Sequence, residues 1–129
     1  MRWQLGGIMH NSHTFDQENQ LLQKSLTNKI IDNYFEQTEI WLRAILRMCV
    51  FSVTHIDGEP VFVVGCPNQG VAKRLSLKIY PFQGVVYYLT DNLNTSDRSL
   101  FCYQDSHGEW QCFDTDTSFW ISLADLQDD

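Results

Sequence analysis

The spacing of hydrophobic residues changes from a helical to a strand-like period near residue 48, and this change constrains the fold more than any other feature. Before it, Leu22, Leu26 and Ile30 recur every four residues, as on the apolar face of an α-helix. After it, two runs rich in Val and Phe flank Asp57-Gly58, a dipeptide that accepts the positive φ angles of a two-residue hairpin turn. Helical structure followed at once by a β-hairpin is therefore predicted.

The first helical region should begin near Thr14, which together with Gln17 resembles a capping box. Its apolar stripe is long for one helix, so a break near residues 27–28 or 37–38, giving a helical hairpin, is an alternative to a single helix. Residues 1–13 are predicted to be a loose arm or a short strand.

The remaining elements follow from turn and capping signals. Asn68 is a typical helix N-cap, and it predicts a short helix of about three turns that ends before Pro81. Further strands are predicted at residues 84–90, 99–105, 109–115 and 119–123. The whole chain, 1–129, is thus expected to be one α+β domain with a frayed acidic end at residues 127–129. Its N-terminal helix or helical hairpin should pack on a mainly antiparallel sheet of about five or six strands, with a short helix after the first hairpin.

Charge and hydropathy exclude several classes of partner. The net charge is −7, and from residue 91 to the end nine acids accompany a single base, Arg98. Such a surface repels phosphate backbones, so no nucleic-acid partner is expected. No run approaches the ~20 apolar residues of a membrane-spanning helix, and the first residues lack the continuous apolar region of a signal peptide. The expectations are no membrane partner and a cytoplasmic location.

Catalytic and metal-binding patterns are weak. The stretch from Gly65 to Gly70 has the glycine spacing of a phosphate-binding loop, but Val71 and Ala72 stand where Lys and Ser or Thr must follow. His55 should pair with Pro60 in the first hairpin, far from the nearest cysteine. No CxxC pair exists among the four cysteines. The sequence nominates no catalytic residue, no cofactor and no metal ligand, and favours a binding role over an enzymatic one.

Cys102 and Cys112 are the best-motivated pair of thiols. A three-residue loop centred on His107 places these two residues opposite each other on neighbouring strands, with Gly108 in the left-handed position that such a loop requires. Opposed Cβ atoms lie about 4.5–5.5 Å apart, slightly beyond disulfide geometry. Two reduced thiols in contact are therefore predicted, on one face of the sheet.

The function that these observations favour is a small acidic protein-binding module of a regulatory, adaptor, chaperone-like or immunity type. Its partner would be another protein, and the chain could also form a homo-oligomer. Aromatic and acidic residues of the second half are the candidate partner contacts: Tyr88, Tyr103, Trp110, Trp120, Asp114 and Asp116. The alternative is a small enzyme or ligand-binding domain with a pocket between helix and sheet near His55, Cys66 or His107.

The stretch from Trp41-Leu42-Arg43 through two strands to CPNQGVAKRL loosely resembles part of a known family. It is similar to the helix–strand–strand–Pro-Asn–helix run in the N-terminal protein-interaction domain of the bacterial replication initiator. The matching positions are Trp41, Pro67 and Asn68, and the similar stretch covers under a third of the chain. This resemblance also implies a partner-binding module.

Overall fold

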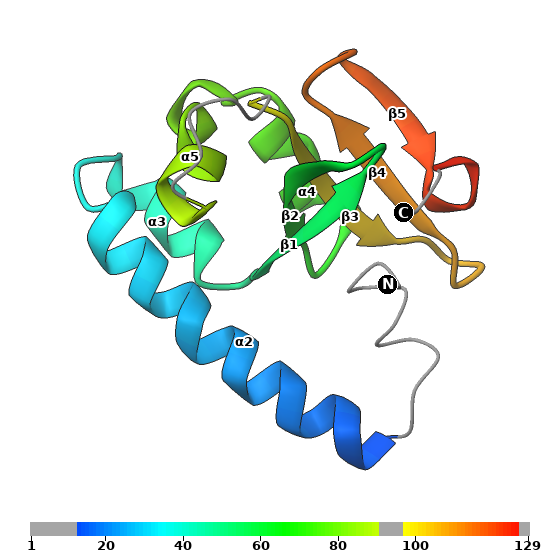
Figure 1. Cartoon of the computed structure of the whole chain (residues 1–129), viewed down its shortest axis with the longest axis horizontal. Helices are drawn as coiled ribbons and strands as arrows, with labels where there is room; N and C mark the ends of the chain where they lie inside the picture. The colour runs from blue at the N-terminus through cyan, green and yellow to red at the C-terminus, as the bar shows by residue number, and fades with distance from the viewer. Residues whose placement is uncertain (1–12, 91–96, 127–129) are drawn as a thin grey trace.

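A computed structural model describes residues 13–90 and 97–126 of the chain, and these form an α+β domain (Figure 1). The element order confirms helices first, then a β-hairpin, a short helix and later strands. The elements are α2 (His13–Tyr34), α3 (Ile40–Leu46), β1 (Val50–Ile56), β2 (Glu59–Gly65), α4 (Gln69–Ser76), the 3-10 helix η1 (Tyr80–Phe82), α5 (Val85–Thr90), β3 (Ser99–Gln104), β4 (Trp110–Asp114), β5 (Phe119–Ser122) and the 3-10 helix η2 (Leu123–Asp125).

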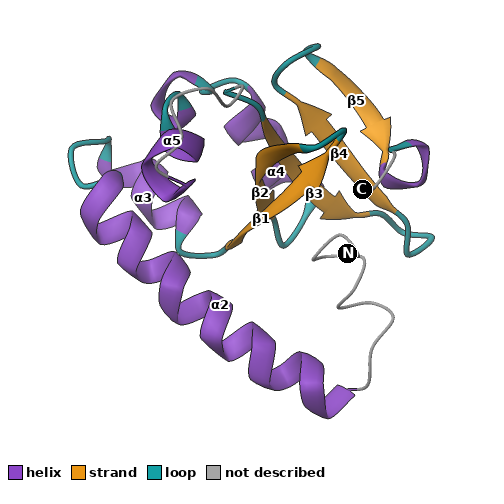
Figure 2. Cartoon of the chain, viewed as in Figure 1, coloured by secondary structure: helices purple, strands orange, loops and turns teal. Residues whose placement is uncertain are grey.

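The five strands form one sheet in their order along the chain, β1-β2-β3-β4-β5 (Figure 2). Neighbouring strands are antiparallel except β2 and β3, which are parallel. A parallel connection must cross over a face of the sheet, and here α4, η1 and α5 make that crossing. The mainly antiparallel sheet of five strands is therefore confirmed.

The main core lies between the helices and one face of the sheet, where buried phenylalanines form a continuous chain of rings. Phe35 of α2 contacts Phe51 of β1 and Phe82 of η1, with ring centroids 6.0 and 5.3 Å apart. Phe51 stands edge-on to Phe62, and Phe82 reaches Phe101. Burying each ring contributes about 2–3 kcal/mol, so this cluster is a main source of stability for the helix–sheet layer.

The opposite face of the sheet carries a smaller core. Because side chains alternate along a strand, the residues next to the phenylalanines point to this second face. Its fully or nearly buried members are Ile56, Val61, Val63, Leu100, Cys102 and Cys112. Leu123 of η2 and Leu126 pack against them, so the C-terminal turn covers part of the face that the helices leave open.

The N-terminal helical region is broken near residues 37–38, which confirms one of the two expected positions. The Thr38 hydroxyl donates to the Phe35 carbonyl at 2.6 Å and satisfies an acceptor that the ended helix leaves free. The helix begins at His13, close to the expected start, while residues 1–12 and 127–129 of the expected arm and frayed end lie outside the described residues.

Two sequence predictions in the crossover are wrong. Residues 84–90 are not a strand, because α5 spans Val85–Thr90, with Val85 and Val86 buried and the two tyrosines after them exposed. The helix after Asn68 ends at Ser76 rather than just before Pro81, which instead sits within η1. The Asn68 cap itself is confirmed, since its Oδ1 accepts from the Val71 N–H at 2.9 Å.

Both β-hairpin turns are confirmed. Asp57 and Gly58 have φ angles of 53° and 80°, the pair of positive values that the first turn needs. In the second, Gly108 has a φ of 81° and the Asp105 N–H donates to the Glu109 carbonyl at 2.8 Å. The β3–β4 register is therefore the predicted one, with Cys102 opposite Cys112.

Candidate functional site

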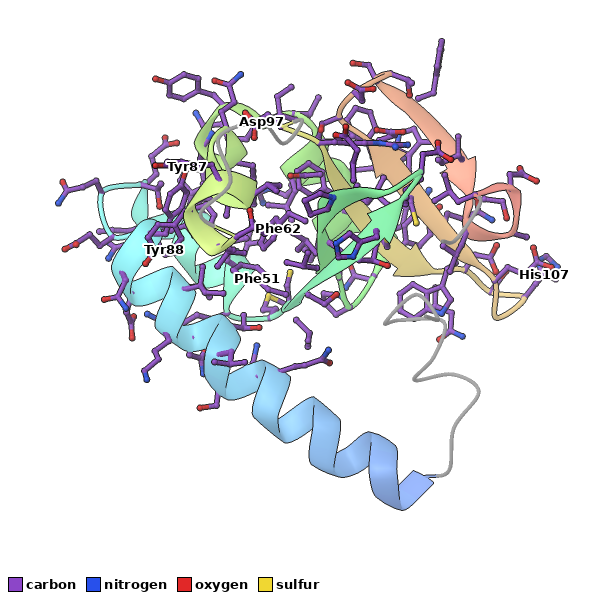
Figure 3. All side chains as sticks on the ribbon, viewed as in Figure 1. Phe51, Phe62, Tyr87, Tyr88, Asp97 and His107 are labelled. Carbon is purple, nitrogen blue, oxygen red and sulfur yellow. The ribbon has the colours of Figure 1, made fainter. Side chains whose placement is uncertain are left out.

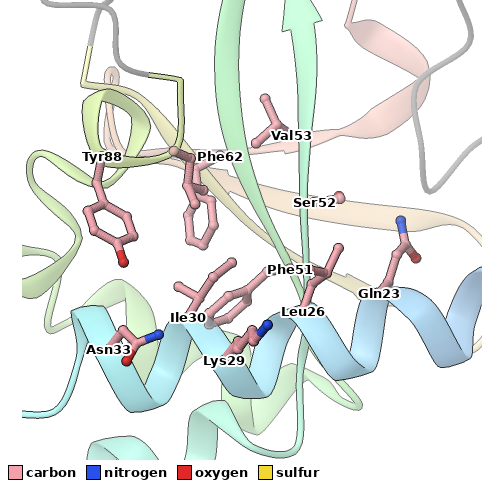
Figure 4. A pocket seen from close by; sticks show the side chains of 11 residues that line it. Gln23, Leu26, Lys29, Ile30, Asn33, Phe51, Ser52, Val53, Phe62 and Tyr88 are labelled. Carbon is pink, nitrogen blue, oxygen red and sulfur yellow. The ribbon is translucent and has the colours of Figure 1, made fainter.

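An apolar groove lies where α2 passes β1, with α5 as its far wall (Figure 4). Its volume is about 490 Å³. The lining residues are Gln23, Leu26, Lys29, Ile30, Asn33, Phe51, Ser52, Val53, Phe62, Tyr88 and Leu89. A pocket between helix and sheet was the alternative expected from sequence, and its volume falls in the range of natural ligand sites, about 300–1,000 Å³.

The floor of this groove is one face of α2. Gln23, Leu26, Ile30 and Asn33 follow each other at intervals of three or four residues, so they lie along one side of the helix. Leu26 is more than half exposed, although it belongs to the apolar stripe that continues into the core. The groove thus exposes the part of the α2 apolar stripe that the sheet does not cover.

The outer edge of β1 forms the neighbouring wall, because β1 is the first strand of the sheet. In a two-residue hairpin the pair next to the turn, Ile56 and Glu59, exchanges hydrogen bonds, and pairing alternates from there. The backbone groups of Phe51, Val53 and His55 therefore point away from β2. The Phe51 N–H confirms this direction, since it donates to Thr27 Oγ1 at 2.8 Å.

Val53 and His55 retain outward N–H and C=O groups with no strand beside them among residues 13–90 and 97–126. Such an edge is a template onto which another extended chain can pair. The groove adjoins this strand edge, since Val53 is part of the edge and also lines the groove. Hydrogen-bonding groups and an apolar hollow consequently stand side by side.

Among the described residues that line the groove, Lys29 is the only charged one. It forms no ion pair with the described part of the chain, and the other polar groups of the lining are uncharged amides and hydroxyls. The neighbouring Lys24 is not available in the same way, because its ammonium donates to the Cys49 carbonyl at 2.7 Å and to the Arg47 carbonyl. Burial lowers the pKa of Lys24.

The far wall is held in place by a pair of tyrosines. Tyr88 lies against Tyr34 with ring centroids 4.7 Å apart, and the Tyr34 hydroxyl donates to the Gln83 carbonyl at 2.6 Å. Burial, aided by the nearby negative charge of Asp97, raises the pKa of Tyr34. Tyr34 therefore stays neutral and keeps its proton for this hydrogen bond at physiological pH.

The aromatic residues predicted as partner contacts divide among three regions. Tyr88 lines the groove. Tyr103 and Trp120 lie together on the far strands of the sheet, with ring centroids 5.8 Å apart, and Trp120 is 39% exposed. Trp110 is half-buried and packs against the smaller core. The fold therefore does not assemble these side chains into one surface.

The two acidic candidates also differ. Asp114 is buried and accepts from the guanidinium of Arg98 at 2.6 and 3.1 Å, so it is unavailable to a partner. It also accepts from the Asp116 N–H at 2.9 Å. Asp116 itself is exposed in the β4–β5 turn.

Cys102 and Cys112 are both fully buried, and neither forms a disulfide. Burial, together with the hydrogen bond to Cys112, raises the pKa of the Cys102 thiol well above its ordinary value. A hydrogen bond with Cys49 and burial likewise raise the pKa of the Cys66 thiol. The Cys102 and Cys66 thiols remain protonated, so they are poor nucleophiles and behave as core residues.

The three residues around which a pocket was expected lie away from the groove. His55 is exposed on β1 beyond Val53, His107 is exposed at the tip of the β3–β4 turn (Figure 3), and Cys66 is buried after β2. None of them lines the groove. The described residues that do line it include no Cys, His, Asp or Glu, so this part of the lining offers no nucleophile with an adjacent base.

Within residues 13–90 and 97–126, no group of three or more His, Cys, Asp or Glu side chains is placed to hold a metal ion. In the same part of the chain, no helix has the length and apolar character needed to cross a membrane. Comparisons with protein-family models, curated proteins and solved structures find no match to this chain. The loose resemblance to the replication initiator's interaction domain therefore gains no family match.

Sequence reasoning did not identify Leu26, Lys29 or Val53 as site residues. The periodicity of α2 marks Leu26 as apolar, but whether it is covered depends on where the sheet ends. The sequence does not show that β1 is an edge strand. β1 is at the edge because β2 pairs with β3 on its other side, and this parallel pairing joins segments that are far apart in the chain.

Proposed function

We propose that the protein is a protein-binding module that accepts an extended segment of a partner along the outer edge of β1. The observation that carries this proposal is the continuity of the edge at Val53 and His55 with the apolar groove on α2. An edge strand alone offers hydrogen bonds without selectivity. A groove beside the edge adds a pocket for particular side chains, and this is the physical basis of strand-addition recognition.

The bound segment would pair with two residues of β1 and insert an apolar side chain between Leu26, Ile30 and Val53. Because side chains alternate along a strand, the next residue of the segment would point away from the groove. Burial of one large side chain contributes about 1.5–3 kcal/mol and each hydrogen bond about 0.5–1.5 kcal/mol. After the ordering of the segment is subtracted, the dissociation constant should be roughly 0.1–10 mM.

Charge favours an acidic residue near the inserted side chain. Lys29 is the one charged group that the described residues contribute to the lining, in a chain whose net charge is −7. A carboxylate in the segment would pair with Lys29, whereas a basic segment would meet the repulsion of Lys29.

A small apolar ligand in the same groove is the second candidate function, favoured by the groove volume of about 490 Å³. Such a ligand would use the hollow and leave the β1 edge untouched. The two functions are therefore separated by whether the backbone groups of Val53 and His55 take part in binding.

A cytoplasmic location is part of the proposal. Two cysteines, Cys102 and Cys112, face each other across β3 and β4 yet remain free thiols, as do the other two. Free thiols are typical of reducing compartments such as the cytosol.

The test is a selection of random peptides displayed on phage against the full chain, followed by binding titrations with the enriched peptides. Leu26→Glu, at a largely exposed groove position, should weaken peptide binding at least about tenfold, since it places a carboxylate in the apolar hollow. Leu77→Glu is the matched control, because Leu77 is 85% exposed and lies outside the groove.

The strand-pairing element is tested with peptides methylated on alternate backbone nitrogens. Methylation at positions whose N–H meets β1 should abolish binding, and methylation at the positions between them should not. Equal tolerance of both methylation patterns, with amide shifts confined to α2 and α5, would instead indicate the small-ligand function. Enriched peptides that bind the Leu26→Glu variant as well as the natural chain contradict both.

A further inference from the structure

Four large apolar side chains stand exposed where the α2–α3 turn meets the segment after α4. Ile40, Leu77 and Tyr80 are 78%, 85% and 78% exposed, and Trp41 is partly exposed. The ion pair of Lys78 with Glu39, at 2.9 Å, joins the two segments. A hollow of about 590 Å³ lies between them, lined in part by Leu77, Ile79, Tyr80 and Pro81.

Two cations of α4 lie beside these side chains. The Arg74 guanidinium lies 5.1 Å from the centre of the Trp41 ring, and Lys73 is exposed beside it on α4. Neither cation forms an ion pair with the described residues, and no acid occurs between Cys66 and Thr90. This surface is called the basic apolar end, and its members are Ile40, Trp41, Lys73, Arg74, Leu77 and Tyr80.

A surface of the opposite charge lies on the last strand. Phe119 is 69% exposed, and Trp120 is seated against Phe113 with ring centroids 5.3 Å apart while part of its ring stays open. Asp116 is exposed in the turn that precedes them, and Asp57 of the first hairpin turn is also exposed. These four residues, Asp57, Asp116, Phe119 and Trp120, are called the acidic aromatic end.

Arg98, the cation that the described residues place near this acidic aromatic end, is already neutralised. Arg98 makes its two hydrogen bonds with the buried carboxylate of Asp114. Asp116 and Asp57 both lie close enough to Arg98 to raise its pKa further, after the larger effect of Asp114. Three acids therefore surround one base, and the exposed carboxylates of Asp57 and Asp116 form no ion pair with the described residues.

The two ends lie far apart. Figure 1 shows α3 and the turn before it toward one end of the long axis and β5 toward the other. β5 is also an edge strand, so its outer backbone groups have no strand beside them in the described part of the sheet.

We propose that the chain associates with itself head to tail, with the basic apolar end of one copy docked on the acidic aromatic end of the next. The charges are complementary in this arrangement, and the exposed apolar side chains of both ends become buried. A two-fold symmetric contact would place like charges against each other at either end. The contact is thus heterologous, and it leaves a free end on each side for further addition. It uses none of the groove residues and stands apart from the proposed peptide site.

The first test is sedimentation of the full chain at concentrations from about 10 µM to 1 mM, in low and in high salt. Average mass should rise with concentration at 50 mM NaCl. At 500 mM NaCl the association should weaken at least roughly tenfold, because the paired charges are then screened. A chain that stays monomeric at 1 mM in low salt overturns the proposal.

The second test uses one blocked variant for each end. Leu77→Glu blocks the basic apolar end and Phe119→Lys blocks the acidic aromatic end; both sites are largely exposed, so the fold should persist, which circular dichroism checks. Each variant alone should remain monomeric. Mixed in equal amounts they should form a dimer that grows no further, since each supplies the end that the other lacks.

This complementation separates the proposal from other assemblies. A two-fold contact through one end would survive in the variant blocked at the other end, and mixing would restore nothing. Either result, or a mixture that stays monomeric, contradicts head-to-tail association. Leu26→Glu, which alters only the groove, is the control and should associate like the natural chain, so a failure here is distinguishable from a failure of the peptide site.

Discussion

Thr27 connects α2 to the edge of the sheet through both roles of its hydroxyl group. The hydroxyl donates to the Gln23 carbonyl at 2.7 Å and accepts from the Phe51 N–H at 2.8 Å. The residue is fully buried, so water cannot replace either contact. Together with the Phe35–Phe51 contact and the hydrogen bonds of Lys24, this side chain holds α2 beside β1, next to the groove.

Replacing Thr27 by Val should lower the free energy of unfolding by about 1–3 kcal/mol, because the buried Phe51 N–H loses its acceptor. Thr27→Ser keeps the hydroxyl and loses one methyl group, so its loss should be about 0.8 kcal/mol. Urea unfolding of both variants measures the difference. A Val variant as stable as the Ser variant would show that the hydrogen bond contributes little.

The Arg98–Asp114 ion pair is the one that the described structure buries most deeply. Asp114→Ala leaves the half-buried guanidinium without its partner, and stability should fall by about 3 kcal/mol. Asp116→Ala, two residues away and exposed, should change stability by no more than about 0.5 kcal/mol. Thermal unfolding of the two variants checks this contrast, which similar losses in both would contradict.

Asp105 makes the second hairpin sensitive to acid. Its carboxylate accepts from the Glu109 and His107 N–H groups and from Gln111 Nε2, and these bonds, that of Glu109 first, lower its pKa. Because the pKa of this carboxyl is lower in the folded than in the unfolded state, the stabilisation is fully present at a pH above the unfolded-state pKa. It is lost as the pH falls through the folded-state pKa. Carboxyl carbon shifts should show Asp105 titrating below its usual value, and Gln111→Ala should raise that pKa. An unchanged midpoint in Gln111→Ala would argue against this network.

At the scale of elements, the short apolar run at residues 84–90 shows why local pattern misleads. Val85, Val86 and Leu89 are apolar at the spacing of one helical face, yet a run of seven residues rich in Val and Tyr fits a buried strand equally well. The segment is a helix because it belongs to the crossover between the parallel strands β2 and β3. The pairing of these strands joins segments far apart in the sequence, so a local pattern does not reveal it. By contrast, both hairpins were predictable, since Asp57-Gly58 and Gly108 specify their turns locally.

The groove was predictable only in outline. A pocket between helix and sheet follows from the layer architecture, but its members depend on which strand is at the edge. Asp114 was likewise predicted as an accessible partner contact from its charge alone. The sequence does not reveal that Arg98 neutralises this carboxylate inside the fold. Whether a side chain is exposed or forms an ion pair depends on the tertiary structure, and composition does not reveal it.

Gly84 determines how α5 begins. Its φ is +86°, and a Cβ there would lie 3.1 Å from the Tyr34 hydroxyl. Gly84→Ala should therefore destabilise the protein by about 1–2 kcal/mol. Gly70→Ala is the matched control in α4, where a Cβ meets only Asn68 Oδ1 at 3.4 Å, and it should be neutral or stabilising by up to about 1 kcal/mol. Denaturant midpoints test the pair, and equal effects would contradict the role of the positive φ.

For the whole molecule, the distribution of charge predicts no affinity for nucleic acid. The net charge is −7, and three of the described cations, Arg47, Lys78 and Arg98, are already paired with carboxylates. Counterion release, the main source of such affinity, therefore has no extended basic surface to act on. Gel-shift titration with duplex DNA and RNA at physiological salt should show no complex at micromolar protein. A shift that weakens with salt would refute this.

The parallel pairing of β2 with β3 determines when the sheet can be completed during synthesis. β2 emerges from the ribosome well before its partner, since Phe62 must wait for Ser99. At about 5–20 residues per second, the nascent chain spends several seconds with the inner edge of β2 unpaired. The apolar run Val61–Val64 lies on that edge and has high β-propensity. An interrupted chain that ends before residue 99 keeps this edge open, and is therefore the form of the protein most prone to aggregate or to be retained by chaperones.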